Sequence, residues 1–451
     1  MDIIREKKNY TGIGYVRYLD NKKLFEININ GFRKIYNDYE YLLLLDSNGN
    51  VIEDAYNYLN VELNEESLKQ RERCFVALKL LYSYMGLFYI IDIKEFDNKE
   101  LNRFISFLKG GIRSNESLLF DGYTVRSNST INNYIGVYRK YFKYLNIDNI
   151  FDEKYCISKI KGGTGFFAHT KKYKVEKYSI SRKTFEREEV PPYIGFDEYE
   201  KIINFVRENY SVREELIIKL MYEYGMRIGE VLGITLEDIV DKKYSKSGVN
   251  EIEIRNRFTD KPWQGAKGCM SIKSRSCYQE PEYYKKGCKD AGYQVIEITN
   301  KTKQLIDEYL GEFIYYPFIS KKLKSNLHNK NIADKVKEEN NNELNCYIFV
   351  SKNLTPITVT GWNRILKNIF LETGISVDSK VKKDGLNHRF RHGFAMFKVL
   401  IEDYDELRLQ RALRHSNPLS CRAYFKPTKS DLKKFELIKK RLLNRGGITL
   451  D

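Results

Sequence analysis

The sequence predicts a mainly α-helical protein with a small antiparallel sheet. Apolar residues recur at helical spacing through long segments such as Glu65–Met85 and Thr360–Thr373, whereas strict alternation is confined to short runs such as Glu251–Phe258. A chain of 451 residues also exceeds the size of one hydrophobic core. We therefore expect a helical domain, a mixed α/β domain and a small β-rich N-terminal extension.

Composition excludes several classes of protein. Hydrophobic residues make up 42% of the chain, which is enough for packed cores and too many for a disordered chain. Apolar runs such as Leu87–Ile91 are much shorter than a membrane span, and no apolar segment of a secretory signal follows Arg5–Lys8. The scattered cysteines form no C-x-x-C pair, which favours reduced thiols and a cytoplasmic location. Three cysteines share one loop, but their irregular spacing does not predict zinc, and we expect neither a metal nor another cofactor: Cys269, Cys277 and Cys288.

The formal net charge of +16 favours a nucleic-acid partner, because each Lys or Arg placed on a phosphate releases counterions. The chain is also rich in Lys, Asn, Ile and Tyr together, a composition typical of AT-rich codon usage. Charge alone therefore leaves nucleic-acid binding and codon bias as open alternatives.

Residues 1–55 carry short alternating runs separated by turns, which predict a β-rich extension. The runs are Gly14–Leu19, Leu24–Ile29 and Tyr41–Leu45. Such an extension is either an accessory DNA-binding module or a packing element.

Residues 56–152 predict a small helical domain. Apolar residues recur at helical spacing over Glu65–Met85, Lys99–Leu108 and Thr130–Leu145, and Asn98 can cap the second of these helices. We interpret the Tyr and Phe stripes of these helices as core rather than as a platform for stacking bases.

Residues 153–192 predict a basic interdomain linker. Between residues 154 and 183 the only acid is Glu176, and a glycine-rich run, Gly162–Gly165, interrupts the lysines. The linker either follows a nucleic-acid backbone or is a solvated tether, and the first interpretation is favoured. Its candidate DNA-binding residues are Lys159, Lys161, Lys171, Lys172 and Lys174.

Residues 193–451 predict the mixed α/β domain. Ser211–Glu214 is a capping box that opens a helix, and Gly225 is placed to end it. Two alternating segments, Glu251–Phe258 and Gln294–Ile298, predict a hairpin with a long lysine-rich connection. Further segments with helical spacing are Glu198–Asn209, Thr302–Tyr309, Thr360–Thr373 and Thr428–Leu443.

Arg227 follows the glycine turn between two apolar helices. An arginine between buried elements costs stability unless it has an anionic partner, and Glu230 lies three residues further on. A ligand phosphate can complete the guanidinium fork, but a plain Arg227–Glu230 structural pair explains the pattern equally well.

The stretch Leu386–Tyr424 is the second candidate for an anion site. A helix expected over Leu386–Glu402 places His388 and Arg391 on one face of its first turn, where free N–H groups favour an anion. After a second short helix and a proline turn, Tyr424 can serve as the group that attacks a phosphate. The alternative is a basic surface helix followed by an ordinary tyrosine.

Together, these motifs resemble the tyrosine recombinases, the phage integrase family. The resemblance rests on G-M-R-I-G-E at Gly225–Glu230, H-R-F-R-H at His388–His392, and L-R-H at Leu413–His415 followed by Tyr424. It implies a catalytic tyrosine-recombinase domain at 193–451, a core-binding domain that clamps DNA at 56–152, and an arm-type DNA-binding module as one interpretation of 1–55. Arg414 departs from the glycine usual before the histidine, so this turn cannot rely on a glycine at positive φ.

The resemblance also implies a reaction. Tyr424 attacks a phosphodiester to give a 3′-phosphotyrosine and a free 5′-hydroxyl, and a hydroxyl later rejoins the DNA without ATP. Arg227 and Arg391 donate to the nonbridging oxygens, while His388 and His415 bind the phosphate or relay protons. Glu230 and His392 are supporting residues. We choose Lys267 to protonate the leaving oxygen, because it lies between two glycines; Lys261, Lys273 and Lys289 remain open.

The expected function is site-specific recombination of a mobile element by integration, excision or transposition. The alternatives are an inactive DNA-binding protein on the same fold and a type IB topoisomerase. The family implies double-stranded DNA as the partner, a tetramer on DNA with dimer intermediates, an accessory DNA-bending or directionality factor, and a nucleoid-associated cytoplasmic location. The apolar residues of the last helix either dock on a neighbouring subunit or pack on their own domain.

Overall fold

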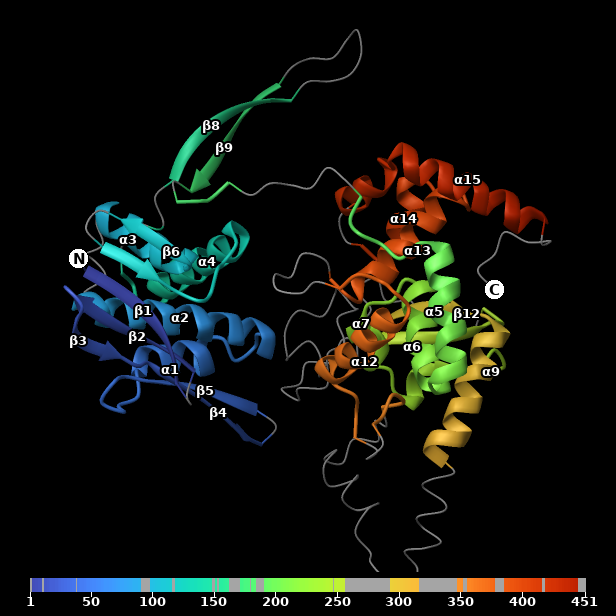
Figure 1. The fold of residues 1–451 in the computed structure, drawn as a ribbon, viewed down its shortest axis with the longest axis horizontal. Coiled ribbons are helices and arrows are strands. Elements are labelled where there is room, and N and C mark those ends of the chain that lie inside the picture. The colour runs from blue at the N-terminus through green and yellow to red at the C-terminus, as the bar shows by residue number, and fades with distance from the viewer. Residues whose placement is uncertain are drawn as a thin grey trace, which may run out of the picture. The chain divides into compact units, whose positions relative to one another are not determined.

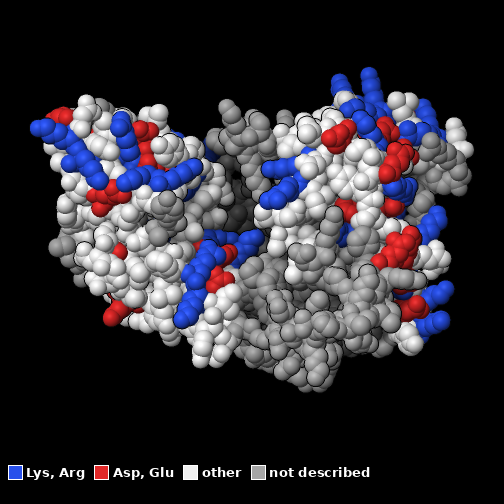
Figure 2. All heavy atoms as spheres, turned by 60° about the horizontal axis from the view of Figure 1, so that its bottom comes forward, with Lys and Arg blue, Asp and Glu red and all other residues white. Residues whose placement is uncertain are grey.

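The computed structural model describes residues 2–9, 12–37, 39–90, 98–115, 118–147, 151, 154–161, 171–178, 180–183, 190–245, 247–255, 293–315, 347–351, 355–377, 385–415 and 418–444. The chain divides into two compact units, Met1–Glu186 and Arg187–Asp451 (Figure 1). Basic side chains lie on both units in the view of Figure 2, interspersed with acidic ones.

The N-terminal unit contains a five-stranded sheet in the order β3-β2-β1-β7-β6. Strand β1 pairs antiparallel with β2 and parallel with β7. The strands are β1 Asp2–Asn9, β2 Gly12–Leu19, β3 Lys22–Ile27, β6 Ile112–Asn115 and β7 Leu118–Asp121. A separate hairpin pairs β4 Asn30–Tyr36 with β5 Tyr39–Leu45.

Helices and the sheet of this unit share one core. Buried residues from the strands, such as Ile4 and Tyr15, belong to the same cluster as Leu78 and Tyr138 from the helices. The predicted division at residue 55 therefore differs from the structure, because β1 pairs with β7 across more than a hundred residues. The interpretation of the aromatic stripes as core is confirmed at Tyr138. The helices are α1 Glu53–Asn57, η1 Tyr58–Glu62, α2 Leu68–Phe88, α3 Asn98–Lys109 and α4 Asn128–Tyr144.

The predicted linker contains a long antiparallel hairpin of β8 Lys154–Lys161 and β9 Lys171–Tyr178. Alternation alone did not reveal it, because lysine occupies positions on both phases of each strand. The five candidate DNA-binding lysines all lie on these strands: Lys159, Lys161, Lys171, Lys172 and Lys174.

The C-terminal unit is a mixed α/β domain, as predicted. Its sheet is three-stranded and antiparallel, in the order β10-β11-β12. The strands are β10 Ile239–Val240, β11 Asn250–Arg255 and β12 Tyr293–Ile298. The helices are α5 Phe196–Asn209, α6 Val212–Tyr222, α7 Ile228–Leu232, η4 Leu236–Asp238, α9 Asn300–Tyr309, η6 Leu310–Tyr315, α12 Val359–Glu372, α13 His388–Leu400, α14 Glu406–Ala412, η7 Pro418–Phe425 and α15 Lys429–Asn444.

Helix α13 lies between the two buried clusters of this unit. Phe390 belongs to one cluster and Phe394 to the other. Gly393 permits a close approach, since a Cβ there would lie 2.2 Å from the carbonyl oxygen of Ile194. Asn387 precedes the helix, but its side chain makes no cap bond and instead accepts from Trp362 Nε1 at 2.7 Å. Packing on both sides therefore fixes the helix that carries the H-R-F-R-H motif.

The last helix packs in part on its own unit. Phe435, Ile438 and Leu442 are buried there, whereas Leu437 and Leu443 are exposed. Among the described helices, none is both long and apolar enough to cross a membrane.

Candidate active site

The first part of the site is the turn between α6 and α7. Gly225 adopts φ +59°, which reverses the chain after α6, and Arg227 is the N-cap residue of α7. The carboxylate of Glu230 accepts from the Arg227 amide at 2.8 Å and from Arg227 Nη1 at 2.6 Å. Glu230 is only 1% exposed, so the Arg227–Glu230 pair considered from the sequence forms around a buried carboxylate.

Arg391 joins this turn to the end of α14. Its side chain donates through Nη1 to the Gly225 carbonyl and through Nη2 to the Leu413 carbonyl, and the residue is 3% exposed. Burial and the neighbouring guanidinium groups lower the pKa of Arg391 to about 9, so it remains a cation at neutral pH. The turn between α6 and α7 and the end of α14 are therefore held together through backbone carbonyl groups.

Arg414 belongs to the same network, a role that sequence reasoning missed. It adopts φ +51°, the left-handed conformation for which the family's glycine is suited. Its Nη2 donates to Glu230 Oε2 at 2.9 Å and to the Gly225 carbonyl at 3.2 Å. The only sequence signal was the unusual arginine in L-R-H, which gave no indication of its partners.

Glu230 is thus surrounded by three arginines. Burial alone would raise the pKa of its carboxyl group, but Arg414, Arg391 and Arg227 outweigh burial and lower it. Arg391 Nη1 lies 4.0 Å from Glu230 Oε2. Three cations around one carboxylate leave an excess of positive charge, which favours binding of an anion.

Tyr424 lies in η7 and makes a hydrogen bond to His392. The hydroxyl oxygen is 2.6 Å from His392 Nδ1, and Tyr424 is 4% exposed. Burial raises the pKa of Tyr424 to about 12, while nearby Arg391 opposes this shift. Burial, His388 and Arg391 lower the pKa of His392 to about 4. At neutral pH the tyrosine is therefore protonated and the imidazole of His392 is neutral. The tyrosine hydroxyl can donate to the imidazole when Nδ1 carries no proton, and Nδ1 can then accept the tyrosine proton.

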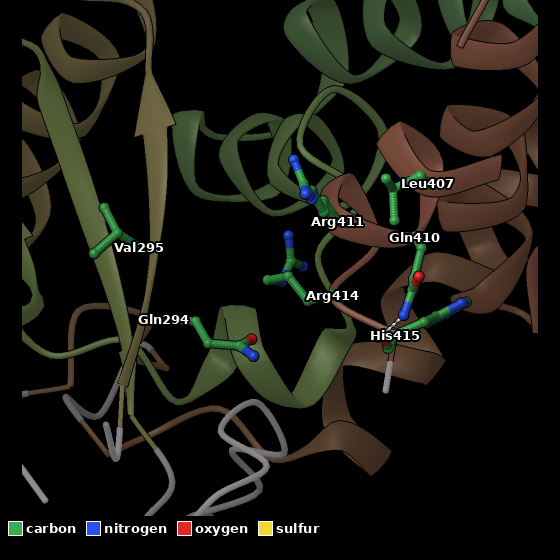
Figure 3. Close-up of a pocket in the computed structure, with 7 residues that line it drawn as sticks. All are labelled: Gln294, Val295, Leu407, Gln410, Arg411, Arg414 and His415. Carbon is green, nitrogen blue, oxygen red and sulfur yellow. Dashed lines mark hydrogen bonds between the residues drawn. The ribbon is translucent and has the colours of Figure 1, made fainter. Parts of the chain in front are cut away.

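His415 follows Arg414, and both its backbone carbonyl and its imidazole ring have hydrogen-bond partners. Gln410 Nε2 donates to the His415 carbonyl at 3.0 Å (Figure 3), and Cys421 Sγ lies 3.4 Å from His415 Nδ1. Burial raises the pKa of the Cys421 thiol to about 11, and burial with Arg391 and Arg227 lowers the pKa of His415 to about 4. A protonated thiol donating to Nδ1 leaves Nε2–H of His415 as a donor for an anion.

His388 is the first residue of α13 and is exposed. Its ring centroid lies 6.0 Å from that of His392, one helical turn further on. Lys267 lies outside the described residues, as do Lys261, Lys273, Lys289 and the three clustered cysteines. The structure thus brings together the predicted residues Arg227, Glu230, His388, Arg391, His392, His415 and Tyr424.

An open cavity of about 590 Å³ lies between α14 and β12, next to this network. Figure 3 shows Gln294 and Val295 on the strand side of the cavity and Gln410 and Arg411 on the α14 side, with the Gln410 side chain directed toward His415. A second cavity of about 530 Å³ shares Val295, Arg411 and Arg414 with the first. Within the part of the chain that the structure describes, no three His, Cys, Asp or Glu side chains are grouped to hold a metal ion.

Comparison with known proteins places these motifs in context. Residues 192–263, which include the Gly225–Glu230 turn, match the phage integrase family. Transposase A of transposon Tn554 from Staphylococcus aureus is 28% identical over 205 residues, which are 45% of this chain and 55% of that protein. The chain thus matches about half the length of this relative.

Solved structures that align with this chain include two DNA complexes. The XerH site-specific recombinase bound to its difH substrate in a pre-cleavage complex aligns with a TM-score of 0.46 and 17% identity, over 79% of this chain and 77% of that chain. The Tn1549 transposon integrase in complex with transposon right end DNA aligns with a TM-score of 0.39 and 15% identity, over 70% and 80% of the two chains.

Proposed function

We propose that this member of the phage integrase (tyrosine recombinase) family is a site-specific recombinase that cuts and rejoins the DNA of a mobile element. The observation that supports it most directly is the hydrogen bond between the Tyr424 hydroxyl and His392 Nδ1, beside Arg391. A buried tyrosine with a proton acceptor and adjacent cations has what a nucleophile toward a phosphodiester needs.

In the proposed cleavage step, Tyr424 forms a bond to phosphorus while the bond from phosphorus to the 5′ oxygen breaks. The tyrosine proton passes to Nδ1 of His392, which lies 2.6 Å from the hydroxyl oxygen. The negative charge of the bound phosphate opposes the effect of the neighbouring cations, so it raises the proton affinity of His392. Rejoining reverses the step, since the bond energy is kept in the phosphotyrosine.

Arg227, Arg391 and His415 are proposed to bind the nonbridging oxygens. The Arg227 side chain is 25% exposed and uses Nη1 for Glu230, so its other donors can reach a ligand. His415 offers Nε2–H when Cys421 holds Nδ1, and the exposed His388 lies at the helix N-terminus. Lys267 is proposed to protonate the 5′ oxygen as it leaves.

The wider assembly is also part of the proposal. Double-stranded DNA is the substrate, the N-terminal unit and the lysines of β8 and β9 contact its backbone, and residues 1–55 take part in arm-type binding. The enzyme acts in the cytoplasm at the nucleoid, as a tetramer on DNA with dimer intermediates and with an accessory bending or directionality factor. Exposed Leu437 and Leu443 on α15 are available for docking between subunits.

A suicide substrate tests the function. A duplex carrying the DNA that flanks the gene, nicked near the cut site, loses a short 5′-hydroxyl fragment on cleavage and traps the covalent adduct. We expect an adduct that survives denaturation, is unaffected by EDTA and disappears in Tyr424→Phe, while DNA binding persists.

Tyr404→Phe is the matched control, because Tyr404 lies between the two motifs and packs against Arg408 at 4.5 Å. DNA binding without an adduct in the wild-type protein would indicate the inactive DNA-binding alternative. Relaxation of supercoiled plasmids that lack the flanking sequences would indicate a topoisomerase.

A further inference from the structure

We propose that Arg414 is a positioning residue for strand cleavage, whose guanidinium group locks the turn carrying His415 onto the turn carrying Arg227. This inference rests on the proposed function. Arg414 itself does not face the substrate in this role: its side chain is 9% exposed, against 25% for Arg227.

The lock consists of contacts to both turns. Arg414 Nη2 donates to Glu230 Oε2 at 2.9 Å and to the Gly225 carbonyl at 3.2 Å, and Nη1 donates to the Ala412 carbonyl at 3.1 Å. One planar group therefore joins the end of α14 to the start of α7. A lysine cannot reproduce this, because a single ammonium group lacks the fixed fork of a guanidinium.

Glu230 connects Arg414 to Arg227, because its carboxylate accepts hydrogen bonds from both residues. Its two carboxylate oxygens divide the contacts: Oε1 accepts from Arg227 Nη1, and Oε2 accepts from the Arg227 amide and from Arg414. Without Arg414, Oε2 loses a charged donor in a site where Glu230 is buried. The carboxylate then keeps only its two hydrogen bonds from Arg227 itself, so no described residue outside the α6–α7 turn holds the pair by a hydrogen bond, and the direction of Arg227 is fixed less tightly.

The backbone of Arg414 supports the same interpretation. A non-glycine residue at φ +51° is strained relative to glycine. This conformation directs the Leu413 carbonyl to Arg391 on one side and places His415 on the other. In Figure 3 the side chains of Arg414 and His415 point in different directions from the end of α14, as a divided role requires. The side-chain contacts of Arg414 offset the backbone strain that glycine would avoid.

Arg414→Gly gives the decisive experiment, because glycine fits the left-handed backbone of this turn while the side chain that carries the guanidinium group is removed. If Arg414 merely occupies the turn, this variant cleaves as fast as the wild type or faster. If Arg414 positions Arg227 and His415, we expect single-turnover adduct formation at saturating suicide duplex to slow by at least about tenfold, with DNA affinity retained. The rate of adduct formation in Arg414→Lys should lie between the rates of the wild type and of Arg414→Gly.

Arg411→Gly is the control, since it removes an exposed cation from the same end of α14. We expect its rate at saturating duplex to stay within about twofold of the wild type. Circular dichroism shows whether Arg414→Gly is folded; if it is not, the rate of Arg414→Lys decides, and a wild-type rate overturns the proposal.

Titration of His415 by NMR gives a readout that does not need cleavage. Arg414 is one of the cations near His415, so we expect the pKa of His415 to rise in Arg414→Gly and to stay unchanged in Arg411→Gly. If the wild type forms no adduct with any duplex, the proposed function fails. The lock is then judged on this titration, and an unchanged His415 overturns it.

Discussion

Two turns of the C-terminal unit adopt the same left-handed backbone conformation by different means. Gly225 has φ +59° and Arg414 has φ +51°, and each precedes a residue proposed to bind the phosphate, Arg227 or His415. At Gly225 the ring of Phe394 occupies the space beside the turn, since a Cβ would lie 2.6 Å from it. At Arg414 the side chain itself holds the turn through Glu230 and the Gly225 carbonyl.

The difference shows that positive φ can be stabilised either by the absence of a side chain or by the contacts of one. The first turn depends on space and the second on charge. These dependences predict different responses to added volume, to pH and to the loss of a single hydrogen bond.

The largest effect is expected from Gly225→Ala. The methyl group adds strain of roughly 1 kcal/mol at positive φ and displaces the Phe394 ring at a cost of about 1–3 kcal/mol more. Phe394 lies one turn after Arg391 on α13, so cleavage should also fall. Urea unfolding followed by tryptophan fluorescence measures the loss in this unit alone, since Trp263 and Trp362 are the only tryptophans.

Gly374→Ala is the matched control for volume. Gly374 ends α12 at φ +70°, but a Cβ there would meet only Lys201 Nζ at 3.9 Å. We expect it to lose only the strain of about 1 kcal/mol. Equal losses in the two variants would show that space is not what holds the Gly225 turn.

Sequence reasoning named most residues of the candidate site because the motifs are local. The capping box at Ser211, the glycine stop at Gly225 and the Arg227–Glu230 pair all lie within short segments and are seen in the structure. The contact between Arg414 and Glu230 joins residues 184 positions apart, and no spacing rule reaches that far. A non-glycine residue in place of a family glycine indicated that the turn was unusual, without indicating what holds it.

The N-terminal unit was predicted less well, because its architecture also depends on contacts between residues far apart in the sequence. Its helices follow from apolar periodicity, and α2, α3 and α4 appear close to the expected positions. Parallel pairing of β1 with β7 merges the extension with the helical domain, and it depends on contacts across the unit rather than on local pattern. The hairpin of β8 and β9 was missed because the high lysine content of both strands was interpreted as a linker, although Lys172–Glu176 alternates between polar and apolar residues.

The pH dependence of the free energy of unfolding is expected to distinguish variants of the two turns, with a smaller effect than Gly225→Ala. His392 and His415 have pKa values of about 4 in the folded protein, below the usual histidine value. Below about pH 6.5 the unfolded chain binds protons that the folded protein does not, so stability falls as the pH is lowered toward 4. Arg414→Met removes a cation that contributes to the depressed pKa of His415, so this variant loses less stability over that range.

The stability deficit of Arg414→Met relative to the wild type should therefore shrink between about pH 7.5 and about pH 5. The deficit of Gly225→Ala should stay constant, since volume does not titrate. Urea unfolding at both pH values measures the two deficits. A constant deficit for Arg414→Met would mean that charge does not distinguish the turns.

The smallest effect is expected at Cys421, which supports the charge-held turn through one hydrogen bond to His415 Nδ1. Cys421→Ala removes that donor, and His415 can then change tautomer and lose the Nε2–H that is proposed to bind the phosphate. A neutral hydrogen bond contributes about 0.5–1.5 kcal/mol, so adduct formation should slow by about 2–10-fold. Cys421→Ser keeps a donor and should recover part of the rate.

Cys74→Ala, which changes a buried cysteine of the other unit, controls for the lost thiol. If Cys421→Ala and Cys74→Ala cleave equally fast, Cys421 does not set the tautomer, and the turn at Arg414 holds His415 without its help.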